Sequence, residues 1–132
     1  MALKRQVGFF EGLKYQGGGP MLAWILHRIS GLSIVFFVGL HVLASFFTQQ
    51  MGSDWAIAVN TVYEHPLFQI FVAFIVLFHA LNGLRIVVQD LWPQYQQYQR
   101  EALWLQWGLF IPVFGMTVFV LVQRALALAS GG

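Results

Sequence analysis

Three long apolar stretches dominate the pattern of hydrophobic and polar positions along the chain. Each is long enough for a helix across the hydrocarbon core of a bilayer, which takes about 20 residues. The run from Phe71 to Phe78 does not alternate between polar and apolar residues, as the strands of a membrane barrel would. The apolar stretches run roughly from Met21 to Thr48, from Pro66 to Val88 and from Leu103 to Val122. They predict an all-α integral membrane protein with three transmembrane helices over about residues 21–48, 66–90 and 103–123.

Composition supports a membrane protein and limits the chemistry of any metal site. Apolar residues make up 58% of the 132 residues and charged residues 9%, and a soluble domain of this size has too little interior for so many apolar side chains. The chain has no cysteine, so any metal ligand must be histidine. We expect one domain over residues 1–132, with residues 1–20 as a surface segment. The few dispersed basic residues do not indicate nucleic-acid binding.

Charged residues around the first span predict its orientation. Lys4, Arg5, Lys14 and Arg28 lie before or at its start, whereas the loop over residues 49–65 has two carboxylates and no Lys or Arg. Cytoplasmic segments carry an excess of Lys and Arg, so the N-terminus and the second loop are predicted to be cytoplasmic. Residues 1–20 lack the features of a secretory signal or a transit peptide, which favours the plasma membrane of a prokaryote.

His79 is the most informative residue, because an ionisable side chain within an apolar span is costly unless it is paired, buried between helices or bound to a ligand. Helical spacing places it on one stripe with Asn82, Gly83, Ile86 and Asp90. Gly83 leaves backbone exposed one turn away, as a flat macrocycle or a close helix requires. The interpretations are a haem-iron ligand and a histidine that is hydrogen-bonded across two helices.

The first span carries two further histidines. His27 and His41 share a stripe and are separated by about 21 Å along the helix axis. Arg28 lies on a neighbouring face, where it can extend to the membrane surface, pair with an anionic group such as a haem propionate, or donate to a quinone carbonyl. Ser30 and Ser33 are interpreted as helix-packing residues.

Residues outside these stripes receive structural interpretations. Arg85 is expected on a different stripe from His79, where it forms an ion pair with Asp90 or contacts a partner subunit. His65, directly before Pro66, is expected to cap the second span or to lie exposed to solvent. Residues 54–63 are expected to form a short helix at the membrane surface.

Two motifs carry a resemblance to a known family. The first motif is Ile25-Leu26-His27-Arg28-Ile29-Ser30-Gly31 and the second is His79-x-x-Asn82-Gly83-Leu84-Arg85-x-x-x-x-Asp90. With these motifs the chain resembles the cytochrome b subunit of succinate dehydrogenase (respiratory complex II), which is a membrane anchor. Both occur in order, each in its own span, and with three spans in 132 residues the resemblance covers essentially the whole chain.

The resemblance implies an electron-transfer and anchor subunit of a succinate:quinone oxidoreductase that acts in catalysis only within the complex. Together with a second small membrane-anchor subunit, it would hold a flavoprotein subunit and an iron–sulfur subunit on the cytoplasmic face. His79 would be an axial ligand of haem b iron, His27 and Arg28 would lie at the haem propionates, and Arg28 would lie at the quinone site. The second axial ligand must come from another chain.

The sequence departs from the family pattern at three positions. Trp24 stands where a serine usually contacts the quinone, but its N–H group and ring can contact a quinone as well. Within the second motif, Ile86 replaces a histidine that often follows the glycine-x-arginine and would contact a propionate. His41 resembles a ligand position of two-haem anchors, so the chain has one haem, or two with His41 as a ligand. The alternatives are the anchor of a quinol:fumarate reductase and a purely structural, haem-free anchor.

Overall fold

The computed structural model describes residues 8, 10, 14 and 18–131. Its long helices are α2 (Gly18–Met51), α4 (Pro66–Leu91) and α5 (Gln99–Ala129), and each is long and apolar enough to cross a membrane. A short helix, α3 (Asp54–Glu64), joins α2 to α4, and a 3-10 helix, η1 (Pro93–Tyr98), leads into α5. The three predicted spans are confirmed. Most of the predicted surface segment, including Lys4 and Arg5, lies outside the described residues.

The helices extend further than their apolar stretches. α2 begins at Gly18, whose φ of 71° suits only glycine well, rather than at residue 21. α5 begins at Gln99 rather than at about residue 103, so Arg100 and Glu101 belong to its first turn. Helix boundaries depend on backbone hydrogen bonds and local breakers, and the polar residues before the third apolar stretch contain no breaker after Pro93.

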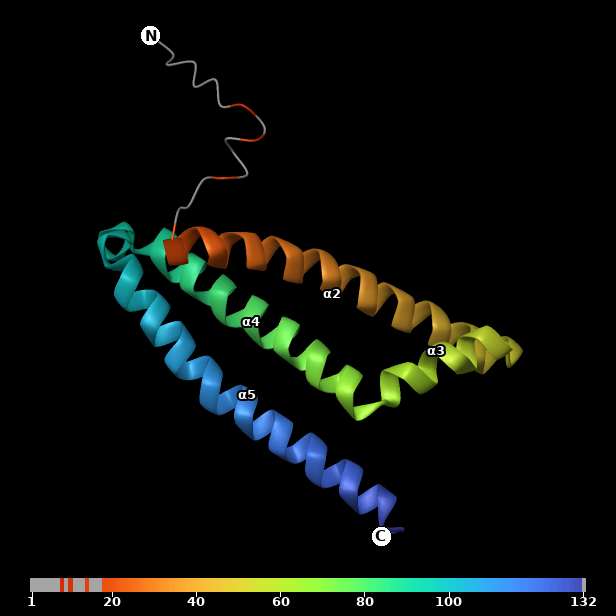
Figure 1. Ribbon diagram of the computed structural model, residues 1–132. Helices are drawn as coiled ribbons and strands as arrows, with labels where there is room; N and C mark the ends of the chain where they lie inside the picture. Colours follow the sequence, from red (N-terminus) through yellow and green to blue (C-terminus); the bar gives the residue numbers. More distant parts are fainter. Residues whose placement is uncertain (1–7, 9, 11–13, 15–17, 132) are drawn as a thin grey trace.

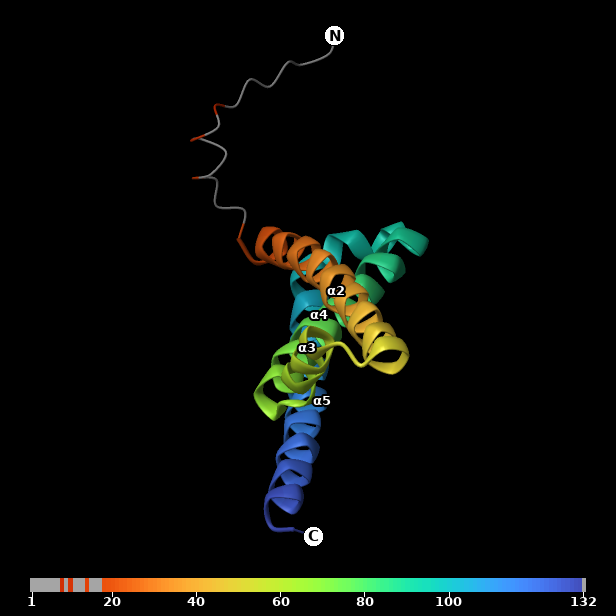
Figure 2. The same cartoon turned by 90° about the vertical axis from the view of Figure 1, so that its right-hand side faces the viewer.

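The long helices converge at one end and separate towards the other (Figures 1 and 2). They meet near η1, where the start of α2 approaches α5: a Cβ built on Gly19 would lie 3.5 Å from Leu103 Cδ1. α4 lies between the other two and contacts both. This central position makes α4 the helix whose residues are most enclosed by protein, including Phe78 and the fully buried Asn82.

Aromatic side chains fill the contact between α4 and α5. Phe74 meets both Phe110 and Phe114 edge to face, with ring centroids 5.2 and 5.6 Å apart. Trp107 lies between Phe78 and Phe110. Large apolar side chains also cover the outward faces of the helices, where lipid is their natural solvent.

The short helix α3 returns along the end of α2. Ala44 and Ala56 are fully buried where the two helices touch, because small residues allow backbones to approach closely. At the end of α3, the hydroxyl of Tyr63 donates to the carbonyl of Phe37 at 2.6 Å. Next to it, His65 Nδ1 accepts from the Leu67 N–H at 3.2 Å, so the predicted short helix and the predicted cap are both confirmed.

Candidate functional site

His27 of α2 and His79 of α4 form a stacked pair near the convergent end of the molecule. Their ring centroids are 4.1 Å apart and the rings are nearly parallel, with an interplanar angle of 4°. Both side chains are partly buried. His79 of α4 therefore meets α2 directly.

Hydrogen bonds at one nitrogen fix the orientation of the His79 ring. Nδ1 lies 3.2 Å from the His27 carbonyl oxygen and 3.1 Å from Ser30 Oγ. The Ser30 hydroxyl itself donates to the His27 carbonyl at 2.8 Å. A proton on Nδ1, donated to the carbonyl, leaves the lone pair on Nε2, which is the tautomer that metal-binding histidines adopt.

The other nitrogen of His79 is available to a ligand. Nε2 makes no hydrogen bond to a described residue, and it is not among the buried side-chain atoms that lack a partner. It therefore remains accessible at the surface of this chain. In contrast, His27 Nδ1 is buried and has no partner within the described part of the chain.

Two glycines allow the histidines to lie between the helices. A Cβ built on Gly31 of α2 would lie only 3.0 Å from His79 Cε1, closer than most Cβ atoms pack. A Cβ built on Gly83 of α4 would lie 3.4 Å from His27 Cε1. Gly83 thus has the role expected from its spacing, but it accommodates His27 rather than His79.

Arg28 and Trp24 form a second contact on α2. The guanidinium carbon lies 4.0 Å from the centroid of the Trp24 ring, which is a cation–π geometry. Both side chains are exposed on this chain. Trp24 also lines a cavity of about 250 Å³ with Arg85, Gln89 and Asp90, whereas Arg28 lies outside that lining.

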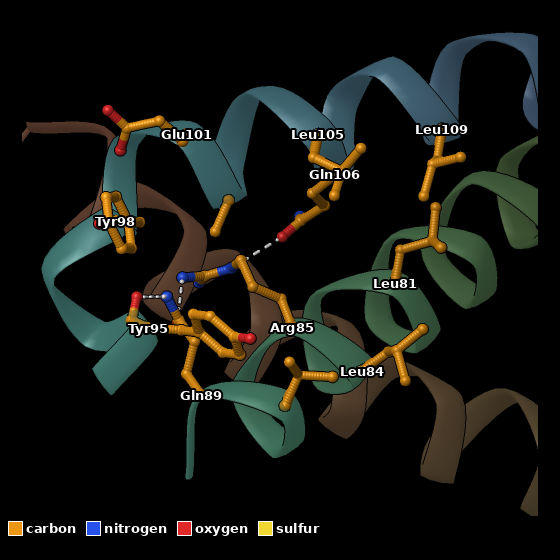
Figure 3. A pocket seen from close by; sticks show the side chains of 12 residues that line it. Leu81, Leu84, Arg85, Gln89, Tyr95, Tyr98, Glu101, Leu105, Gln106 and Leu109 are labelled. Atoms are coloured by element: carbon orange, nitrogen blue, oxygen red, sulfur yellow. Dashed lines mark hydrogen bonds between the residues drawn. The ribbon is translucent and has the colours of Figure 1, made fainter. Parts of the chain in front are cut away.

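Arg85 is the centre of a polar cluster that joins α4 to α5 (Figure 3). Its side chain donates to Asn82 Oδ1 at 3.1 Å and to Gln89 Oε1 at 3.2 Å on its own helix. It also donates to Gln99 Oε1 at 2.8 Å and to Gln106 Oε1 at 2.9 Å on α5. The prediction of an ion pair between Arg85 and Asp90 is therefore wrong, because the guanidinium turns towards the amides of α5.

His41 lies apart from the other two histidines. Its exposed ring stacks on Tyr63 of α3, with centroids 4.9 Å apart and an interplanar angle of 28°. It makes no hydrogen bond to a described residue. The structure thus brings together His27 and His79, places Arg28 and Trp24 nearby on α2, and leaves His41 at the α3 end.

Sequence reasoning missed several contributors to these contacts. Ser30 was interpreted as a packing residue, although its spacing of three from His27 places its hydroxyl on the same face. Gln99 and Gln106 were not singled out, although a spacing of seven positions places both side chains on one face of α5. A glutamine in an apolar stretch, such as Gln106, is a sequence signal for such a cluster, because a buried amide needs a hydrogen-bond partner.

No group of three or more His, Cys, Asp and Glu side chains capable of holding a bare metal ion occurs among the described residues. Haem iron needs only one side chain from each axial side, because the porphyrin supplies the other ligands. An imidazole with a fixed Nδ1 and an accessible Nε2 therefore fits a haem ligand better than it fits a site for a bare ion.

Comparisons with known proteins agree with this architecture. Residues 13–122 match the family described as succinate dehydrogenase/fumarate reductase transmembrane subunit. The succinate dehydrogenase 2 membrane subunit SdhC of Mycobacterium tuberculosis is 37% identical over 100 residues, which cover 74% of this chain and 73% of that protein. The succinate dehydrogenase hydrophobic membrane anchor subunit of Archaeoglobus fulgidus is 33% identical over 72 residues, which cover 52% of this chain and 61% of that protein. The chain belongs to the family of succinate dehydrogenase/fumarate reductase transmembrane subunits and is a membrane-anchor subunit, a non-catalytic part of that complex.

Proposed function

We propose that this anchor subunit binds haem b and helps to form a quinone site, so that electrons pass from an iron–sulfur subunit to quinone. The observation that carries the proposal is the fixed ring of His79. Its Nδ1 is held by the His27 carbonyl and Ser30, and its Nε2 remains accessible. This arrangement presents a lone pair in a constant direction, as an axial ligand of iron requires.

The residues around His79 fit a planar group. Gly31 and Gly83 keep the space beside the two imidazoles free of Cβ atoms, and the buried Nδ1 of His27 still needs a hydrogen-bond partner. When bound, the haem supplies a one-electron carrier within the membrane. His79 would be one axial ligand, and a second small anchor subunit would provide the other. His27 and Arg28 would bind the propionates, whose charge needs a cation when it is buried.

Arg28 and Trp24 support a quinone site at the same end of α2. Reduction places negative charge on a quinone oxygen, and a guanidinium in a medium of low dielectric stabilises that charge strongly. Stacking on Trp24 holds the guanidinium in place. Trp24 can also donate its N–H group, and its ring already lines a cavity of about 250 Å³.

The complex would contain this chain, the second anchor, an iron–sulfur subunit and a flavoprotein subunit in the plasma membrane of a prokaryote. The similarity to the hydrophobic membrane anchor subunit of Archaeoglobus fulgidus supports the anchor role. The alternative function is the anchor of a quinol:fumarate reductase, in which the same residues would serve electron transfer in the reverse direction, from quinol. His41 as ligand of a second haem is a further proposal, and its exposed ring, stacked on Tyr63, would have to turn towards the iron.

A haem-free anchor is the main alternative. It would have the same hydrogen bonds at His79 Nδ1, but it gives no function to Nε2 of His79 or to Nδ1 of His27. The two proposals differ in haem content, so the test is a pyridine haemochrome spectrum with iron per polypeptide on the purified complex. We expect at least one haem b per anchor pair.

Replacing His79→Ala should abolish the low-spin spectrum of that haem, because a strong-field axial ligand is lost. His65→Ala is the matched control, since His65 caps α4 at the opposite end and should leave the spectrum unchanged. The amount of each subunit is measured on every preparation. A wild-type spectrum in the assembled His79→Ala complex would return His79 to a packing role.

A further inference from the structure

The Arg85 cluster holds a positive charge with neutral ligands. The four groups that bind the guanidinium are the amide oxygens of Asn82, Gln89, Gln99 and Gln106. Arginine donates and never accepts, so these contacts fix which end of each amide faces it. The charge is therefore solvated by dipoles and keeps its full value.

No carboxylate of a described residue lies within 4.0 Å of the guanidinium, which is the limit for an ion pair. The carboxylates in the neighbourhood are Asp90, which lines the 250 Å³ cavity with Arg85, and Glu101, which lines a cavity of about 340 Å³ between α4 and α5 (Figure 3). Both side chains are exposed, so water and ions screen them more than they screen Arg85.

The side-chain atoms of the cluster that lack a hydrogen-bond partner are both N–H donors, which present partial positive charge as Arg85 does. Asn82 Nδ2 and Gln106 Nε2 are buried hydrogen-bond donors without a partner among the described residues. Asn82 is fully buried, and Gln89 and Gln106 are about 5% exposed or less. The cluster thus combines one cation with unpaired donors, and among the described residues no carboxylate within it cancels the charge.

This charge lies close to His79 on the same helix. Six residues separate the two positions, which is about 9 Å along the axis, and Asn82, which binds the guanidinium, stands one turn from His79. A positive charge at this distance, in a membrane interior, favours any state that gains an electron.

We infer that Arg85 is a positioning residue for electron transfer that raises the reduction potential of the haem at His79 through its uncompensated charge. The inference rests on the proposed haem. Charge near a haem is one of the means by which a protein sets the potential of the iron. The amides hold the guanidinium in place without neutralising it, as this role requires.

The test introduces a carboxylate into the cluster without removing the arginine. In Gln106→Glu the new carboxylate keeps the bond from Arg85 Nε, and its negative charge cancels the field. At about 10 Å and an effective dielectric constant near 20, cancelling one charge changes the ratio of reduced to oxidised haem by about tenfold. That change lowers the midpoint potential by about 59 mV for a one-electron couple.

Potentiometric titration of the haem spectrum in the purified complex measures this shift. Gln99→Glu is a second, less buried variant and should shift the potential in the same direction. Gln123→Glu is the matched control, because it adds the same charge to α5 about 26 Å further along the helix. Arg85→Lys, which keeps the charge, should retain most of the wild-type potential.

The outcomes separate this inference from the function on which it rests. If Gln106→Glu and Gln99→Glu both retain haem at the wild-type potential, Arg85 only joins α4 to α5 and the inference is wrong. An equal shift in Gln123→Glu would also overturn it, because the effect would not depend on position. A wild-type complex without haem would overturn the proposed function and the inference together.

Discussion

Glycine positions decide how closely the histidines of α2 and α4 approach. Gly31 touches the edge of the His79 ring, whereas Gly39, two turns further along the same helix, has no atom near its missing Cβ. The same residue type therefore has different significance at the two positions. At Gly31 the absence of a side chain makes room for an imidazole that two hydrogen bonds hold in place.

Gly31→Ala and Gly39→Ala should consequently have opposite effects. Alanine favours a helix over glycine by about 1 kcal/mol, so Gly39→Ala should leave the complex as stable or more stable. At Gly31 the new methyl group would lie 3.0 Å from His79 Cε1, and overpacking of this kind costs about 1–3 kcal/mol. Thermal unfolding of the purified complexes measures both effects, and equal stability of the two variants would contradict the close contact.

Arg28 provides a second prediction at this scale. Losing one donor to a developing anion typically slows a reaction by about 10²- to 10³-fold, so Arg28→Leu should strongly slow electron transfer from succinate to quinone. Succinate oxidation with an artificial acceptor that takes electrons from the soluble subunits should continue. Arg124→Leu, at the far end of α5, is the control. Equal loss in both assays would indicate failed assembly, and unchanged quinone reduction would leave Arg28 without a role in this step.

At the scale of helices, α3 is attached to α2 by a few specific contacts. The Asn60 side chain donates to Thr48 Oγ1 at 3.0 Å, and Tyr63 donates to the Phe37 carbonyl. These bonds hold two helices together where the small residues Ala44 and Ala56 offer little apolar area. Ring contacts of Phe47 with Trp55 and of His41 with Tyr63 add to these hydrogen bonds.

Tyr63→Phe tests this contact. The variant loses one hydrogen bond, for which mutational studies give about 0.5–1.5 kcal/mol, and it should expose the turn at Gly52 to limited proteolysis. Tyr98→Phe is the control, because the Tyr98 side chain is exposed. Unchanged proteolysis in Tyr63→Phe would mean that packing alone holds α3.

The same residue makes the contact sensitive to alkaline pH. Burial raises the pKa of Tyr63 above its ordinary value of 10. The folded chain then holds the phenol proton at a pH where the unfolded chain has lost it, so stability is complete below pH 10 and falls as the pH rises through the folded pKa. Thermal unfolding from pH 9 to 11 should show this decline in the wild type and a smaller one in Tyr63→Phe. Equal declines would assign the effect to other groups.

At the scale of the whole molecule, the sequence predicts local features but not the axial offset between neighbouring helices. The three spans, α3 and the His65 cap follow from nearby residues, so they were predictable. Stacking of His27 on His79 depends on how far α2 slides along α4, and no periodicity within one helix contains that offset. The expected ion pair between Arg85 and Asp90 was based on charge complementarity alone, and it does not form. The amides that bind Arg85 come from two helices whose register only the folded chain defines.

Orientation in the membrane is a prediction for the whole chain. Reporter fusions at Gly52, between α2 and α3, and at Gln96, within η1, should lie on opposite sides of the membrane. We expect the first outside and the second inside, because Lys and Arg are concentrated before α2. The reverse result would place the end with Arg28 and Trp24 away from the cytoplasm and would contradict the proposed entry of electrons there.

The length of α2 has a consequence for the bilayer itself. Its 34 residues extend about 51 Å, well beyond a hydrocarbon core of about 30 Å. The bond from Tyr63 to Phe37 places the end of α3 fourteen residues before the last residue of α2. The surplus of α2 and all of α3 thus form a hairpin about 20 Å tall beyond the start of α4. Because α2 is longer than the hydrocarbon core, a change in its tilt is the means by which it can meet lipids of different thickness.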